Sequence, residues 1–285
     1  MALSGGGEVR MKMSADSGRM TDKGPGRTDW HVHIGAFADA YYRAEDVFGA
    51  LRAAGTTEVW FSSTTSGFGL QIGGKPAGAG AVYRYIRGEM RDALAAAERT
   101  GMKAHALYWV MPEVHCAPDA PVRLARAMEE LPYEGFKLHP SGNAWDWDDP
   151  AVERLADEVF AFAGERGMRV VVHCGPDPTE RPAVFERFVA RHPGATVQLA
   201  HCRPLKETCQ MLRKHPNTVC DTAFAAKATQ VAIRAFGLGN RMLHGTDFPA
   251  THWYANRETP PTGTVPAMDL AEFALRTGGG GWEEE

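Results

Sequence analysis

Short apolar runs alternate with segments of helical periodicity along most of this chain. The runs are rich in β-branched and aromatic residues, which favour strands, and the intervening segments repeat apolar residues at helical spacing. The predicted strands cover residues 28–33, 58–62, 103–109, 135–139, 169–173, 196–201, 218–221 and 241–245. The predicted helices cover residues 44–54, 82–100, 120–131, 150–166, 181–191, 205–214, 226–236 and 267–276.

This regular alternation of strands and helices is typical of an α/β fold, the single (β/α)8 TIM barrel. Gly55, Gly101 and Gly167 follow predicted helices, as glycine often does at a helix end. A doubly wound open sheet is the structural alternative, but no G-x-G-x-x-G motif follows the first predicted strand. We therefore predict one barrel over residues 28–276, with flexible, Gly-rich tails at residues 1–27 and 277–285.

Composition narrows the range of partners and locations. The formal net charge of the 285 residues is −4 and Lys and Arg do not cluster, which argues against nucleic acid or an anionic membrane as partner. No apolar run reaches the ~18 residues of a transmembrane helix. The five cysteines lack C-x-x-C spacing, so neither a disulfide framework nor a zinc knuckle is predicted. We expect a cytoplasmic protein with a small-molecule substrate, and apolar surface on the outer helices could support a homo-oligomer.

Candidate chemistry begins with His31 and His33, which are two residues apart on the first predicted strand. Residues at this spacing on a strand point to the same side, so the two imidazoles could form half of a transition-metal site. The alternative is that two histidines simply lie close together near the start of the chain.

Further polar residues stand where other predicted strands end. Lys137 and His139 end the fourth strand, His173 the fifth and His201 the sixth, and Asp247 follows the eighth. In a barrel the carboxyl ends of all strands surround one mouth, where enzymes of this fold keep their active sites. This placement favours a functional cluster over chance.

These positions carry motifs that resemble a known family. The motifs are D-W-H-V-H at residues 29–33, G-F-K-L-H-P at 135–140, V-H-C-G at 172–175, A-H-C at 200–202 and G-T-D-F-P at 245–249. Together they resemble the amidohydrolase superfamily, and most closely its amidohydrolase-related branch of metal-dependent hydrolases and decarboxylases. The resemblance covers roughly residues 28–249.

The resemblance implies a role for each matching residue. His31, His33, His173 and Asp247 would hold one divalent metal ion, most readily Zn2+, with Mn2+ or a similar ion as the alternative. His201 would act beside the metal as a catalytic group. Such an ion lowers the pKa of bound water to about 7, and Asp247 could accept the proton of that water during attack.

Lys137 leaves the number of metal ions open. In two-metal members of the superfamily a lysine at this strand is carboxylated and bridges the ions, and His201 then becomes a ligand. We favour one metal ion, with Lys137 and His139 facing the substrate. Arg203 could bind a substrate carboxylate, or it could be an exposed arginine opening the next helix. Trp145, in the loop after the fourth strand, is expected to form an aromatic wall.

The predicted function is a metal-dependent hydrolase that cleaves a small amide, lactone or ester with metal-activated water. The alternative is a metal-dependent non-oxidative decarboxylase of a small aromatic or unsaturated carboxylic acid, which can use nearly the same site. A third hypothesis is a barrel that binds a metabolite or protein without turnover. That hypothesis predicts a missing metal ligand, whereas all four are present.

Overall fold

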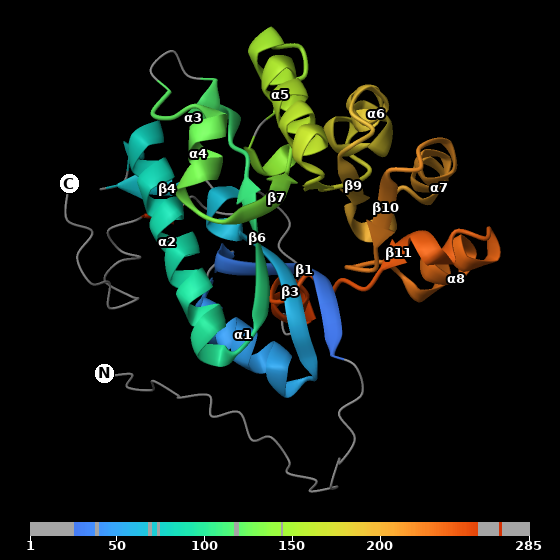
Figure 1. Cartoon of the computed structure of the whole chain (residues 1–285), viewed down its shortest axis with the longest axis horizontal. Helices are drawn as coiled ribbons and strands as arrows, with labels where there is room; N and C mark the ends of the chain where they lie inside the picture. Colours follow the sequence, from blue (N-terminus) through green and yellow to red (C-terminus); the bar gives the residue numbers. More distant parts are fainter. Residues whose placement is uncertain are drawn as a thin grey trace, which may run out of the picture.

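The computed structural model describes residues 26–37, 40–67, 70–72, 75–116, 120–143, 145–255 and 268–269. Within these residues the main sheet has nine strands in the order β11-β10-β9-β8-β7-β6-β3-β1-β2 (Figure 1). Their bounds are β1 Arg27–Phe37, β2 Ala40–Tyr42, β3 Thr56–Ser63, β6 Lys103–Trp109, β7 Tyr133–Leu138, β8 Arg169–Val172, β9 Thr196–Leu199, β10 Thr218–Asp221 and β11 Met242–Leu243. A small second sheet joins β4 Leu70–Ile72, β5 Lys75–Pro76 and β12 Met268–Asp269.

The strands of the main sheet run parallel and follow one another in chain order, apart from the antiparallel β2. The register from β7 to β9 is regular: Lys137 of β7 is opposite Val171 of β8, which is opposite Gln198 of β9. Since parallel strands begin and end at the same edges, every strand exit lies along one edge of the sheet. That edge carries the candidate site.

Helices cover the outside of the curled sheet (Figure 1). The α-helices of the described residues are α1 Ala44–Ala53, α2 Ala79–Thr100, α3 Pro112–His115, α4 Leu124–Glu130, α5 Pro150–Arg166, α6 Pro182–Arg191, α7 Leu205–Lys214, α8 Lys227–Ala235 and α9 Ala250–Ala255, of which α9 lies at the cavity and not on the outside. Helix α5 shows why these segments are helical: Asp149 caps its first turn by accepting from the Ala151 amide, Pro150 occupies the first position, and Gly167 ends it with φ 64°. Its apolar face, including Leu155 and Phe160, packs in the core.

The two ends of the parallel series meet through backbone hydrogen bonds. Between β1 and β11 there is no strand ladder among the described residues, so the sheet is an open, curled half-barrel. The segment after Leu243 bridges this gap: the Trp30 amide donates to the His244 carbonyl at 2.9 Å, and the Asp247 amide donates to the His31 carbonyl at 2.8 Å. This bridge brings residues from opposite ends of the chain to one place.

The predicted α/β class is confirmed, as are the predicted strands and the first seven helices, with shifts of a few residues at their ends. The described sheet is an open half-barrel, in which β11 is shorter than the predicted strand 241–245, and the closed (β/α)8 barrel stays a prediction. Met268–Asp269 form β12 where the start of the helix 267–276 was predicted. Most of that helix, and both predicted tails apart from residues 26–27, lie outside the described residues. In the part of the chain that is described, no helix is both long and apolar enough to cross a bilayer.

Candidate active site

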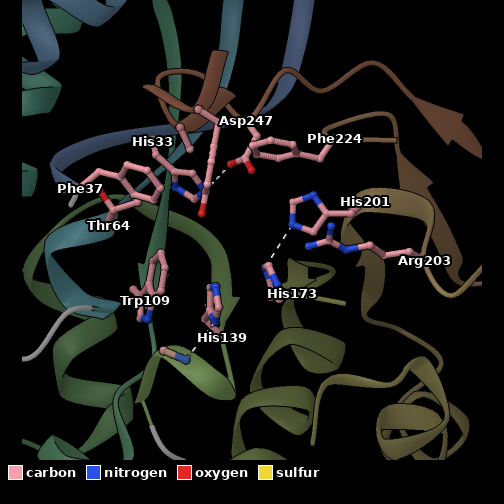
Figure 2. Close-up of a pocket in the computed structure, with 13 residues that line it drawn as sticks. His33, Phe37, Thr64, Trp109, His139, His173, His201, Arg203, Phe224 and Asp247 are labelled. Carbon is pink, nitrogen blue, oxygen red and sulfur yellow. Dashed lines mark hydrogen bonds and ion pairs between the residues drawn. The ribbon is translucent and has the colours of Figure 1, made fainter. Parts of the chain in front are cut away.

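A cavity of about 320 Å3 opens at the carboxyl edge of the parallel strands (Figure 2). It is the place where most of the predicted site residues converge, from segments far apart in sequence. Its lining comprises His33, Phe37, Thr64, Trp109, His139, Gly142, His173, His201, Arg203, Phe224, Asp247, Ala250 and Tyr254. The fold therefore gathers imidazoles, one carboxylate, one guanidinium and several aromatic rings around a single space.

His31, His33 and Asp247 form the tightest group beside this cavity. His31 Nε2 lies 3.2 Å from His33 Nε2, and Asp247 Oδ1 lies 2.9 Å from His33 Nε2 and 3.6 Å from His31 Nε2. Both rings lie on the same side of β1, as their spacing predicts. Asp247 Oδ1 is buried and has no well-formed hydrogen bond to any described residue. A buried carboxylate oxygen facing two imidazole nitrogens in this way is suited to a cation.

Asp29 fixes the segment that carries Asp247. Its carboxylate accepts from the Thr246 amide at 3.0 Å and from the Thr246 hydroxyl at 2.6 Å. Asp247 itself has φ 55°, in the left-handed region that non-glycine residues rarely adopt. The strained residue is thus held from both sides, by Asp29 through Thr246 and by the hydrogen bond that its own amide donates to the His31 carbonyl.

Asp221, at the end of β10, is a site residue that the sequence reasoning missed. Its Oδ2 accepts from His31 Nδ1 at 3.1 Å and from Gln198 Nε2 at 2.7 Å, and its Oδ1 accepts from the His201 amide at 3.1 Å. A carboxylate bound to one ring nitrogen fixes the tautomer of a histidine and frees the other nitrogen for a metal. The signal was its place at a predicted strand end, the pattern that singled out the histidines.

His201 sits in a strained turn directly after β9, with φ 69°. Its Nδ1 donates to the Ala223 carbonyl at 3.0 Å, so its Nε2 carries the lone pair of the neutral ring. That Nε2 lies 3.1 Å from His173 Nδ1. Ligand atoms of His201, His31 and Asp247 also lie within 4.8 Å of one another. His201 is therefore close enough to His31 and Asp247 to share a metal ion with them.

His173 lies on the far side of His201 and belongs to a second group. Ligand atoms of His173, His139 and Glu180 lie within 4.8 Å of one another. The rings of His139 and His173 stack with centroids 3.8 Å apart, and Glu180 Oε2 lies 3.7 Å from His173 Nε2. His201 thus links the two groups.

Burial controls the charges of the site. Burial lowers the pKa of His33 to about 4 and that of His201 to about 3, so both rings are neutral at neutral pH. The pKa of His173 is also well below its ordinary value, chiefly through burial. Burial alone raises the pKa of Asp247, but the attraction of His31 and His33 outweighs it and the pKa lies well below the usual range. The site therefore offers neutral nitrogens and an ionised carboxylate.

A protein-family model described as amidohydrolase matches residues 28–261, most of the chain. The chain belongs to the amidohydrolase family. This agrees with the superfamily that the strand-end motifs indicated. Among curated proteins, none matches the sequence of the chain.

Solved structures share the fold of this amidohydrolase at low sequence identity. One is a dihydroxybenzoic acid decarboxylase from Polaromonas sp. JS666 with bound manganese and the inhibitor 2-nitroresorcinol, with TM-score 0.53, 13% identity and coverage of 82% of this chain and 92% of that chain. Another is a 2,6-dihydroxybenzoate decarboxylase complexed with 2,6-dihydroxybenzoate, with TM-score 0.50, 14% identity and coverage of 88% and 99%. At these identities the likeness establishes the fold.

The family implies a divalent metal ion, and the residues of this amidohydrolase fit one. His31 and His201 each use Nδ1 to donate to an oxygen, which leaves Nε2 of each ring as a lone-pair donor. Asp247 supplies a buried, ionised oxygen beside them, 3.6 Å from His31 Nε2 and 2.9 Å from His33 Nε2. Two or three imidazoles with one carboxylate make a donor set that accepts zinc, manganese and similar ions.

The remaining predicted residues lie at different distances from the cavity. Lys137 is buried beneath it, with Nζ 3.2 Å from His31 Nε2, and does not line it. Burial lowers the pKa of Lys137. His139 and Arg203 line the cavity as predicted substrate-side residues would. Trp145 instead packs in the core, 5.3 Å from the ring of Trp147, so the predicted aromatic wall is formed by other residues.

Proposed function

We propose that this amidohydrolase is a metal-dependent decarboxylase of a small aromatic carboxylic acid. The make-up of the cavity carries the proposal. Aromatic rings stand on its walls, and one guanidinium shares the space. The rings are those of Phe37, Trp109, Phe224 and Tyr254. Flat apolar walls suit an aryl ring, and a guanidinium suits the carboxylate of an aryl acid.

Arg203 is the guanidinium in question. Its Nε donates to the Cys174 carbonyl at 2.9 Å, which anchors the side chain, and it forms no ion pair with any described residue. Figure 2 shows its guanidinium beside His173 and His201 at the cavity. An anchored, half-buried cation without a carboxylate partner is favourable where a substrate anion completes the pair.

The ion would be held by His31, His33 and Asp247, with His201 as the nearest further nitrogen. The assignment of His173 as the fourth ligand, with His201 beside the metal, stays a prediction, as does the choice of zinc over manganese. When bound, the ion would supply Lewis-acid polarisation of a substrate oxygen. In decarboxylation the bond from ring carbon to carboxylate breaks, carbon dioxide leaves, and a proton replaces it. The hydrogen bond between His201 and His173 would hold a proton beside the cavity.

The fold neighbours support this choice only at the level of architecture. Two of them are decarboxylases of dihydroxybenzoates, but one fold serves many reactions. We also infer that the bridge between β1 and the segment after β11 makes the half-barrel act as a (β/α)8 barrel, with its active site at the usual mouth.

Hydrolysis of an amide, lactone or ester is the second candidate. The observation that favours it is Asp247, whose buried, ionised Oδ1 lies 2.9 Å from His33 Nε2 and 3.6 Å from His31 Nε2. A carboxylate in that state can accept the proton of an attacking water. Both reactions use the same cluster, so products separate them.

The test is product analysis on protein loaded with Mn2+ or Zn2+. A panel of hydroxybenzoates is incubated beside aryl amides, esters and lactones, and carbon dioxide and new acids are measured. We expect carbon dioxide and the corresponding phenol from a hydroxybenzoate, with Arg203→Met raising KM about 10- to 100-fold through loss of a charged hydrogen bond. New acid from an amide, ester or lactone without carbon dioxide release would establish hydrolysis instead.

A further inference from the structure

His139 is held between two aromatic faces at the cavity. The Trp109 ring stacks on one face, with centroids 5.5 Å apart and planes at 11°. The His173 ring stacks on the other, at 3.8 Å and 18°. A ring held from both sides cannot turn without breaking both contacts, so the direction of its nitrogens is set by the fold.

The environment of Nδ1 decides which nitrogen of His139 carries the proton. The Gly142 amide donates to Nδ1 at 3.1 Å, in a hydrogen bond shared with the carbonyl oxygen of His139. A backbone N–H can only donate, so Nδ1 must present a lone pair. The Ser141 hydroxyl lies 3.4 Å from Nδ1 but donates its proton to Glu180.

The competing reading is a charged His139 paired with Glu180. The Glu180 Oε1 atom lies 3.6 Å from Nδ1, too far for a hydrogen bond. That oxygen already accepts from the Ser141 amide at 3.3 Å and from the Ser141 hydroxyl.

A neutral ring with a lone pair on Nδ1 has its proton on Nε2. Figure 2 shows that the nitrogen opposite the Gly142 contact faces the cavity. We propose that His139 Nε2–H is a fixed, uncharged hydrogen-bond donor that forms a subsite for an acceptor oxygen of the substrate, such as a carboxylate or phenolate oxygen. The inference rests on the proposed function, because it deepens the recognition of an aryl acid.

The same geometry excludes two other roles for His139. Its lone pair points at Gly142 and away from the cavity, so it cannot act as a general base toward bound substrate. Because Nε2 carries a proton and has no lone pair, it also cannot bind a metal ion in the cavity. What remains is polarisation of an oxygen, a role that a neutral imidazole can fill in an active site.

The tautomer is tested directly by nitrogen-15 NMR on zinc-loaded protein with labelled histidine. His139 signals are assigned by their loss in His139→Phe. We expect a pyridine-type Nδ1 and a pyrrole-type Nε2 at neutral pH. A protonated Nδ1, whether in the other tautomer or in the cation, would overturn the proposal.

The subsite is tested by calorimetric binding of 2-hydroxybenzoate to matched variants. Gln places an amide nitrogen near the position of Nε2, Asn places one near Nδ1, and Phe keeps the stacking but has no donor. We expect a loss of about 10- to 100-fold for His139→Phe and His139→Asn, and a much smaller loss for His139→Gln. Unfolding midpoints and metal content of all variants are compared with those of the original protein.

Equal affinity in all three variants, or retention by Asn with loss by Gln, would contradict the subsite. Failure of the unaltered protein to bind either 2-hydroxybenzoate or benzoate would also overturn it. Binding without carbon dioxide release would refute the proposed decarboxylation and leave the subsite standing. Carbon dioxide release together with a protonated Nδ1 would support the decarboxylation and refute the subsite.

Discussion

The two edges of the curled sheet use the same kinds of residues for opposite purposes. At the amino edge, both ring nitrogens of His105 face carboxylates, with Glu134 at 2.8 Å and Glu58 at 2.7 Å. Lys103 also pairs with Glu58 at 2.8 Å. At the carboxyl edge, His31 and His201 each spend one nitrogen on an oxygen acceptor and keep the other toward Asp247 or a neighbouring imidazole. At the amino edge both histidine nitrogens are occupied by carboxylates, so the contacts are structural. At the carboxyl edge each histidine keeps one nitrogen for other partners, which allows it to react.

Backbone conformation divides the molecule in the same way. The non-glycine residues with positive φ among those described are His201, Cys202, Phe224 and Asp247, and all follow the carboxyl ends of strands. Each such residue costs about 1–3 kcal/mol unless its surroundings hold it. At the amino edge Arg169 lies over the Trp30 ring at 4.3 Å and donates to Gln198 at 3.0 Å without any such strain. Backbone strain and the potential metal-ligand atoms thus occur together at the carboxyl edge, as is typical of a functional site.

The largest expected effect comes from Asp247→Asn. The change removes the ionised oxygen that faces His31 and His33, so metal affinity should fall at least about 100-fold and turnover should fall to background. Metal content by elemental analysis and activity with added ion check this. The matched control at the other edge is Glu134→Gln, which removes a partly exposed partner of His105. If both variants lose metal equally, the contrast between the edges is wrong.

Asp221→Asn should have the next largest effect. An amide keeps only one acceptor oxygen, so it can no longer accept from His31 and Gln198 on one side and from the His201 amide on the other, and the tautomer and direction of His31 are released. We expect metal affinity to fall about 10- to 100-fold, as for other carboxylates behind a ligating histidine. Competition with a metallochromic chelator measures the affinity. Unchanged affinity would mean that His31 is oriented by the strand alone.

Strand ends explain which site residues could be predicted from the sequence and which could not. Strand periodicity and parallel topology place His31, His33 and Asp247 together, because strand exits share one edge. Asp221 also stands at a predicted strand end, but its role depends on contacts with His31 and Gln198 from other strands, which its position alone does not give. Glu180 ends a short 3-10 helix, Pro178–Glu180, whose position beside His139 and His173 no local pattern indicates. The approach of His201 to His31 and Asp247 depends on the strained turn at His201. Local sequence patterns do not show which residues from different strands and loops contact one another.

Acid should weaken the metal-free protein at the carboxyl edge first. The pKa of His33 is lowered by burial to about 4, below its ordinary value in the unfolded chain, so the unfolded state binds the extra proton more readily. Its contribution to stability is complete above pH ~6.5 and is lost as the pH falls toward 4, at about 1.4 kcal/mol per unit of pKa difference. Urea unfolding of chelator-treated protein at pH 7 and pH 5 measures the loss. His33→Gln should flatten the dependence in this window, and an unaltered slope would contradict the buried neutral ring.

The amino edge should respond in a lower pH window and by a smaller amount. The hydrogen bond from Lys103, aided by His105 and Thr28, outweighs partial burial and lowers the pKa of Glu58 to about 2. A carboxyl whose pKa is depressed stabilises the fold above its unfolded pKa of ~4.5 and loses that contribution as the pH falls through 2. Glu58→Gln should therefore alter unfolding curves only below pH ~4.5, and only slightly, because partly exposed pairs are screened by solvent. A change in the window between pH 5 and pH 7 would show that the two edges are electrostatically coupled and not separate.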